Sequence, residues 1–94
     1  MTTDDQDQAR KDWTVAVDVD EHDGHTRAKA RLHWGDQAAV GIGVSRLDPR
    51  DRNVADIGDE LAVARALADL ARRMMTVTVH DIEAVTNEPV TSLH

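Results

Sequence analysis

The feature that most constrains the fold is Asp23-Gly24, which separates two stretches of alternating apolar and polar residues. Residues 13–20 carry their apolar side chains at odd positions, and residues 26–34 carry theirs at even positions. Alternation with a period of two is typical of a strand with one buried face. Asp-Gly is a strong signal for a two-residue type I′ turn, because glycine adopts positive φ without strain. The sequence therefore predicts an antiparallel hairpin.

Counting outward from this turn supports the hairpin. His22 and His25 flank the turn and face each other. Beyond them, apolar residues meet apolar residues and acids meet bases in the pairs Asp20–Arg27, Val19–Ala28, Asp18–Lys29, Val17–Ala30, Val15–Leu32 and Trp13–Trp34. A slip of one residue would move every side chain to the opposite face. We expect both tryptophans on the inner face, which leaves no exposed aromatic side chain for base stacking.

A third alternating stretch covers 38–44, and its register depends on the turn before it. A two-residue loop at Gly35-Asp36 would point Val40 and Ile42 outward. We prefer a three-residue loop, 35–37, which is a known hairpin class. It pairs Trp34 with Ala38, Leu32 with Val40, Ala30 with Ile42 and Ala28 with Val44.

A helix is predicted after the third strand, with Asp56 as its N-cap. Its apolar face is expected to pack on the sheet through Ile57, Leu61, Ala64, Leu67, Ala68, Ala71 and Met75. The pairs Arg65–Asp69 and Asp69–Arg73 are spaced i,i+4 and are interpreted as a solvated face. The fold class is therefore α+β, with a three-stranded antiparallel meander before the helix.

The following segment is ambiguous. Residues 76–80 alternate like a strand, but Thr78 and Asp81 have the spacing of a capping box. We favour a short second helix over 79–86, ended by Pro89. The domain organisation is then a disordered acidic tail over 1–11, one domain over 12–88 and a loose C-terminus over 89–94.

Composition narrows the class of protein. The chain has 94 residues and no cysteine, and its formal net charge is −7. It has no apolar run of membrane-spanning length and no signal-peptide segment, so we expect a cytoplasmic protein without a membrane partner. The charge is uneven, at −6 over 1–23 and +3 over 24–52. The overall acidity is unlike most nucleic-acid binders, but the basic middle third keeps that class open.

The sequence offers no catalytic set. There is no cysteine or tyrosine, and Ser45 and Ser92 lie in no nucleophile motif. His22 and His25 flank a turn and lack a third metal ligand held by packing. Gly41 and Gly43 lie within a strand, which does not fit a nucleotide-binding loop. We expect no enzymatic activity, no cofactor, no metal and no small-molecule substrate.

Two binding surfaces are predicted on the outer sheet face. Arg27, Lys29 and Arg31 have a spacing that suits a phosphate backbone, although Asp18 and Asp20 opposite them suggest simple cross-strand neutralisation. The small residues Ala16, Ala39, Gly41 and Gly43 are expected to leave this face flat, and the sheet has two free edges. Exposed edges favour association, so we expect a homodimer.

Several stretches carry a resemblance to a known family. They are 20–32, 40–43, 46–49, 57–61, 64–67 and 81–86. The chain resembles a family of small actinobacterial proteins of unknown function with a fold related to double-stranded-RNA-binding domains. The resemblance implies an association with the dormancy response to low oxygen in mycobacteria, and a dimeric fold similar to ribosome hibernation promoting factors.

The function that the resemblance implies is a non-enzymatic stress or dormancy factor that binds ribosomes or rRNA and silences translation. The residues on which that binding would depend are Arg27, Lys29, Arg31, Arg46, Arg50 and Arg52. The alternative is a homodimeric protein-interaction module with no nucleic-acid binding.

Overall fold

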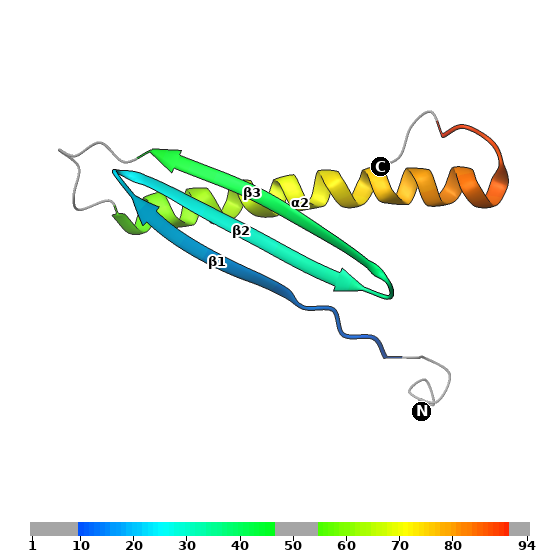
Figure 1. Ribbon diagram of the computed structural model, residues 1–94, viewed down its shortest axis with the longest axis horizontal. Helices are drawn as coiled ribbons and strands as arrows, with labels where there is room; N and C mark the ends of the chain where they lie inside the picture. Colours follow the sequence, from blue (N-terminus) through cyan, green and yellow to red (C-terminus); the bar gives the residue numbers. More distant parts are fainter. Residues whose placement is uncertain (1–9, 47–54, 91–94) are drawn as a thin grey trace, which may run out of the picture.

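The computed structural model describes residues 10–46 and 55–90, which form one sheet and one helix. The elements are β1 (Val15–His22), β2 (His25–Trp34), β3 (Gln37–Arg46) and α2 (Ala55–Thr86). The strands form an antiparallel sheet in the order β1-β2-β3. As Figure 1 shows, α2 runs along one face of this sheet and continues beyond the turn between β2 and β3. The predicted α+β class with a three-stranded meander is confirmed.

The register of the first hairpin is as predicted. His22 faces His25, Asp20 faces Arg27, and all the predicted pairs between them and Val15–Leu32 are present. Asp23 and Gly24 have φ angles of 52° and 76°, the left-handed values that a type I′ turn requires.

The predicted register of the second hairpin is wrong by one residue. The loop is the two-residue Gly35-Asp36, so that Trp34 faces Gln37 and Leu32 faces Ala39. Ala30 and Ala28 then face Gly41 and Gly43, whereas Val40, Ile42 and Val44 lie on the outer face. The two glycines, not the two large residues, therefore point towards the helix.

Close approach of α2 explains this register. A Cβ atom on Gly41 would overlap the backbone of Ala66 and Leu70, and one on Gly43 would overlap the backbone of Ala62 and Ala66. Glycine in a strand often marks such an approach of another backbone. The sheet can hold the helix this closely only if glycine faces it. The two-residue loop places Gly41 and Gly43 on the helix side, and the three-residue loop does not.

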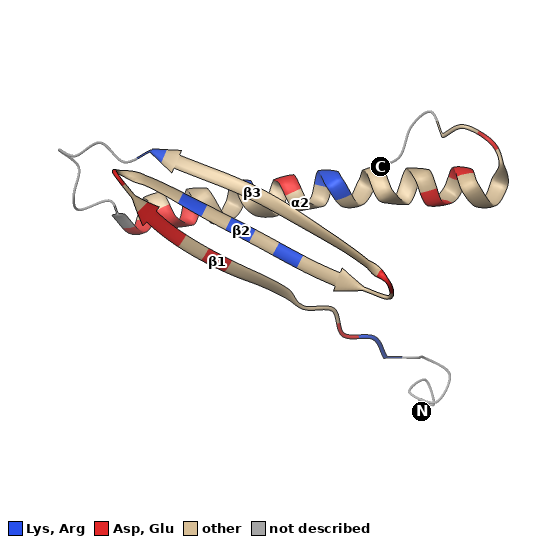
Figure 2. Ribbon diagram, viewed as in Figure 1, with Lys and Arg blue, Asp and Glu red and all other residues tan. Residues whose placement is uncertain are grey.

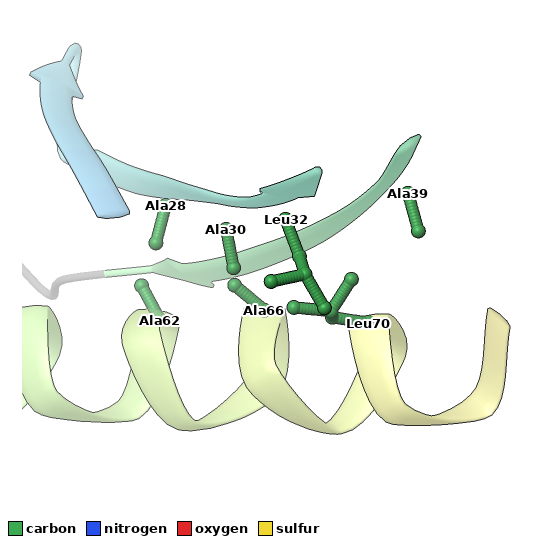
Figure 3. Packing of buried hydrophobic residues seen from close by; sticks show 7 residues of the cluster. All are labelled: Ala28, Ala30, Leu32, Ala39, Ala62, Ala66 and Leu70. Carbon is green, nitrogen blue, oxygen red and sulfur yellow. The ribbon is translucent and has the colours of Figure 1, made fainter. Parts of the chain in front are cut away.

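The core between sheet and helix is small. Figure 3 shows its members, which are Ala28, Ala30, Leu32, Ala39, Ala62, Ala66 and Leu70. Five of the seven are alanines, so two leucines supply most of the apolar volume. Two polar residues, Thr26 and Ser45, are also buried, and the Ser45 hydroxyl donates to the Gly58 carbonyl at 2.7 Å.

The helix turns a different face to the sheet from the one predicted. Ala62, Ala66 and Leu70 are buried against the strands, whereas Ile57, Leu61, Leu67 and Met75 are exposed. The predicted stripe exists, but it lies on the side away from the sheet. The sequence pattern correctly identified an apolar face of the helix, but the prediction that this face packs on the sheet is wrong.

The separate second helix is also not found, because residues 79–86 continue α2 without a break. β-branched residues lose side-chain freedom in a helix and so disfavour it. In the continuous helix, the hydroxyls of Thr76 and Thr78 donate to backbone carbonyls four residues earlier. The helix ends at Thr86, where Asn87 has a φ of 61° and its N–H donates to the Glu83 carbonyl at 2.7 Å. A residue in this left-handed conformation is a common helix C-cap.

The helix covers the sheet unevenly. Its contacts are mainly with β3 and β2, and it scarcely touches β1. Val15, Val17 and Val19 have the inward register of a core strand, but all three remain exposed. The strand alternation indicates a buried face for Val15 and Val17, but α2 lies too far towards β3 to cover them.

Candidate nucleic-acid interface

The basic residues of β2 lie on the face of the sheet that carries no helix. Arg27, Lys29 and Arg31 occupy alternate, exposed positions of the central strand. Figure 2 shows them as three blue bands along β2, beside the red acidic residues of β1. Alternate residues of a strand are about 6.6–6.8 Å apart on one face. The structure therefore brings together three of the six predicted candidates.

The acidic residues of β1 partly neutralise this basic row. Asp18 faces Lys29 and Asp20 faces Arg27 in the register. Asp18 also accepts a hydrogen bond from Arg31 Nη2 at 2.6 Å, a diagonal contact in which both side chains are about half exposed. An exposed ion pair of this kind is worth only about 0–1 kcal/mol. A polyanion can compete with Asp18 for Arg31 at little cost.

The third stripe of the outer face is apolar. Because the register of β3 differs from the predicted one, the neighbours of Arg27, Lys29 and Arg31 are Val44, Ile42 and Val40. Ala39, Gly41 and Gly43 face the helix instead, so the expectation of a flat outer face built from small residues is wrong. The outer face is an acidic, a basic and an apolar stripe side by side.

The remaining basic candidates lie at or beyond the end of β3. Arg46 is the last residue of that strand and is exposed. Arg50 and Arg52 lie outside the described residues.

Of the two tryptophans predicted on the inner face, Trp34 packs against the core, whereas Trp13 is exposed. Trp13 precedes β1 and is 55% exposed, and Trp34 is partly buried at the end of β2. Their rings stack with centroids 5.9 Å apart and an interplanar angle of 18°. They line an open hollow of about 740 Å³ together with Arg31 and His33. The sheet thus has an accessible aromatic surface. Strand alternation alone could not reveal it, because alternation predicts the face on which a side chain lies but not whether another element covers that face.

The free edge of β3 is closed by polar side chains that the sequence suggested were merely solvated. Asp69 Oδ2 accepts a hydrogen bond from the Ile42 N–H at 2.8 Å, and Arg65 Nη1 donates to the Val44 carbonyl at 2.7 Å. Arg73 Nε donates to the same oxygen of Asp69 at 3.1 Å. Unpaired groups on an edge strand invite pairing with other chains. Asp69 and Arg65 therefore protect this edge.

The environment of Asp69 favours its charged form. The hydrogen bond from the Ile42 N–H, followed by that from Arg73, holds the pKa of Asp69 below its ordinary value against the opposing effect of desolvation. The side chain is 18% exposed.

The histidines at the first turn make local contacts. His22 Nε2 lies 3.2 Å from Asp23 Oδ2, and His25 Nδ1 lies 3.2 Å from the Asp23 carbonyl oxygen. Within residues 10–46 and 55–90, no group of three potential metal ligands converges. In the same part of the chain, no helix is long and apolar enough to cross a membrane.

An open antiparallel sheet, one covering helix and surface stripes of charge define a small α+β protein with one uncovered sheet face. The chain belongs to the Rv2632c-like family, whose profile matches residues 11–91. It is 55% identical over 94 residues to the uncharacterized protein MT1780 of Mycobacterium tuberculosis strain CDC 1551, with full coverage of both chains.

The chain is also 53% identical over 90 residues to the uncharacterized protein Rv2632c of Mycobacterium tuberculosis strain H37Rv, with 96% of this chain and 97% of that protein aligned. The crystal structure of Rv2632c superposes with a TM-score of 0.79 at 52% identity, and covers 87% of this chain and 98% of that one. The relatives are uncharacterized, so the membership establishes the family and the fold without assigning a function.

Proposed function

We propose that this protein is a non-enzymatic, homodimeric stress or dormancy factor in the cytoplasm that binds rRNA on the ribosome and silences translation. The observation that carries the proposal is the row of Arg27, Lys29 and Arg31 on a sheet face that no helix covers. Basic side chains at regular spacing contact phosphates and give binding that does not depend on base sequence. Arg46 extends the basic character to the end of β3.

The acidic and basic residues are unevenly distributed along the chain, and this distribution affects such binding. The acids are concentrated in the N-terminal 23 residues, whereas the basic row lies on the central strand. The neutralising partners on β1 are exposed, so their ion pairs contribute little and exchange readily for phosphate. The accessible tryptophan pair beside Arg31 adds a surface on which an unstacked base can lie.

A second candidate function is a homodimeric protein-interaction module without nucleic-acid binding. It is favoured by the large exposed apolar residues, which include Val40 and Val44 beside the basic row and outnumber the two buried leucines. Exposed apolar patches commonly mark protein interfaces.

Salt dependence and charge reversal separate these functions. The test is co-sedimentation of the protein with actinobacterial ribosomes over a salt series, for the wild type and for the double variant Arg27→Glu/Lys29→Glu. We expect saturable binding that weakens with salt, and a slope of log affinity against log salt that is smaller by about two in the variant, because two phosphate contacts are lost.

A matched control reverses two other bases, Arg10→Glu/Lys11→Glu, which lie before β1 and change the net charge by the same amount. Equal weakening in both variants would show a general charge effect and contradict a site on β2. Absence of binding at low salt would contradict the ribosomal role and leave the interaction module.

A further inference from the structure

The two edges of the sheet differ in how the rest of the molecule covers them. The backbone of β3 is bonded by Asp69, which accepts from the Ile42 N–H, and by Arg65, which donates to the Val44 carbonyl. At the other edge, no group of residues 10–46 and 55–90 hydrogen-bonds to the backbone of β1 on the side away from β2. The helix α2 scarcely touches β1, and all eight residues of this strand are exposed. We call the side of β1 away from β2 the open edge.

The first turn determines which backbone groups point to the open edge. His22 and His25 flank a two-residue turn and form a hydrogen-bonded pair, so alternate residues of β1 bond β2 and the others point away from it. The residues that point away are Val15, Val17, Val19 and Glu21. The same count from the second turn selects Ile42 and Val44 on β3, and these are the residues whose backbone groups α2 contacts.

The side chains on the helix side of the open edge are apolar and uncovered. Val15, Val17 and Val19 have the inward register, yet they are 36% to 41% exposed, because α2 lies over β3 and β2. The apolar side chains of a strand added to β1 would lie beside these valines, since neighbouring strands are about 4.8 Å apart. Such a contact would remove from water the apolar surface that the helix leaves exposed.

The opposite side of the open edge is acidic. β1 contains three acidic residues and no lysine or arginine, and Asp18 and Asp20 lie on the outer face of the sheet. They appear among the red bands at the border of the sheet in Figure 2. An open hollow of about 460 Å³ lies beside them, and it is lined by Val17, Asp18, Val19, Asp20, Arg27 and Lys29. A strand added here therefore needs basic side chains on its outer face.

β2 shows which kind of strand is complementary to β1. Over residues 27–32 its basic and apolar residues alternate, so that Arg27 and Lys29 face Asp20 and Asp18 while the residues between them face valines. Opposite charges and apolar side chains directly across a strand pair stabilise a sheet. Because the side chains of β1 present the same two faces to a neighbour on either side, the same alternating pattern fits the open edge.

We propose that the open edge binds an extended segment of a different protein, in which basic residues alternate with apolar ones, as a fourth strand of the sheet. A peptide that adds a strand to an exposed edge gains affinity from main-chain hydrogen bonds and specificity from its alternate side chains. The bases lie opposite Asp18 and Asp20, and the apolar side chains lie beside the valines. This site goes beyond the proposed function and does not depend on it, because RNA binding uses the outer face of β2.

Charge argues against a second copy of this chain as the added strand. A symmetric pairing of two open edges is antiparallel and must join the backbone groups that point away from β2 in each copy. In the two such registers that pair most of β1 with itself, Asp18 faces either Asp18 or Asp20 of the other copy. Like charges directly opposite each other are destabilising. A basic segment removes this repulsion, and an acidic strand does not.

The first test measures the binding of a fluorescently labelled synthetic peptide, Lys-Val-Arg-Val-Lys-Val-Arg, by fluorescence anisotropy. Val17→Pro removes an N–H that points to the open edge and leaves the bonds between β1 and β2 in place. Val17→Thr is the matched control, because it keeps the N–H and a β-branched side chain. We expect the peptide to bind about tenfold or more weakly to Val17→Pro, and less than about threefold more weakly to Val17→Thr.

A second pair of variants tests the charge and does not depend on how well the proline is tolerated. Asp20→Lys reverses a charge at the open edge, whereas Glu88→Lys changes the net charge by the same amount at an exposed position after the end of α2. We expect Asp20→Lys to weaken peptide binding about threefold to tenfold and Glu88→Lys to leave it unchanged. A peptide with glutamate in place of its bases should not bind. Circular dichroism shows whether each variant remains folded.

Several outcomes would overturn the proposal. Equal binding to the wild type and to a folded Val17→Pro would show that the peptide is held by charge and does not pair as a strand. Equal weakening by Asp20→Lys and Glu88→Lys would show a general charge effect. Absence of binding at low salt with peptide at about 1 mM would exclude the site. In analytical ultracentrifugation, conversion of an oligomeric wild type into a monomer by Val17→Pro would assign the open edge to a second copy.

Discussion

The two sides of α2 are both apolar, but they differ in the size of their side chains and in what they contact. The side facing the sheet presents Ala62, Ala66 and Leu70 to strands that carry glycine and alanine. The opposite side presents larger residues, such as Ile57, Leu61 and Met75, to solvent. The difference shows that the larger apolar side chains of an amphipathic helix need not form its intramolecular contact.

Close approach explains why the small residues are inside. Two backbones that pack through alanine and glycine lose little side-chain entropy and gain many van der Waals contacts. The sheet-facing side is therefore specified by fit. Substitutions on this side should consequently destabilise the protein far more than substitutions on the opposite, exposed side.

The largest effect is expected where the fit is tightest. Gly43→Ala places a Cβ atom against the backbone of Ala62 and Ala66, which can yield only if α2 moves. We expect a loss of at least about 3 kcal/mol in the free energy of unfolding, the upper range for overpacking. Chemical denaturation at several protein concentrations measures it.

Gly35→Ala provides a comparison for that substitution. Gly35 has a positive φ of 54°, unlike Gly43, and no atom lies within 4 Å of its missing Cβ. Its replacement should cost only about 1–2 kcal/mol, the penalty of the left-handed backbone conformation for an alanine. Similar losses for both variants would contradict the close approach of helix and sheet.

A second, smaller effect contrasts one leucine from each side. Leu70→Ala removes a buried side chain and should cost about 2–4 kcal/mol at every protein concentration. Leu61→Ala should cost under about 1 kcal/mol, because its side chain is 42% exposed.

Chemical denaturation of both variants distinguishes the two leucines. A loss of the same size in both variants would show that Leu61 is part of the core. The contrast between the two sides of α2 would then disappear.

The sequence predicted the parts of this fold that local patterns determine. The Asp23-Gly24 turn and the charge and apolar pairing around it set the first hairpin correctly. The second turn lacks such a check. Burial of Val40 and Ile42 favours the three-residue loop, whereas the contact between Gly41 and α2 decides the register. A preference for burying large residues fails where a helix packs on glycine.

The binding surface shows the same limit. Alternation along β2 correctly placed Arg27, Lys29 and Arg31 on one exposed face. It could not show that Val40 and Val44 lie beside them, since that depends on the register of β3. Nor could it show that Asp69, which has the spacing of an ordinary helical ion pair, reaches the Ile42 N–H at 2.8 Å.

The smallest predicted effect concerns Asp69, which joins the sheet-facing side of α2 to the edge of β3. Its pKa is lowered in the folded protein, so its carboxylate stabilises the fold above the pKa of the unfolded chain, about 3.9. This contribution is lost as the pH falls through the lower folded pKa. Asp69→Asn keeps an oxygen that can accept from Ile42 but removes the charge.

We therefore expect Asp69→Asn to be less stable than the wild type at neutral pH, with the difference shrinking as the pH falls below about 4. Denaturation of both proteins between pH 7 and pH 2 measures this difference directly. Arg73→Gln should show a partial version, because it leaves the hydrogen bond from Ile42 and removes the one from Arg73. A difference that stays constant with pH would mean that Asp69 acts through its shape and hydrogen bonding, and that its charge contributes nothing to holding α2 on β3.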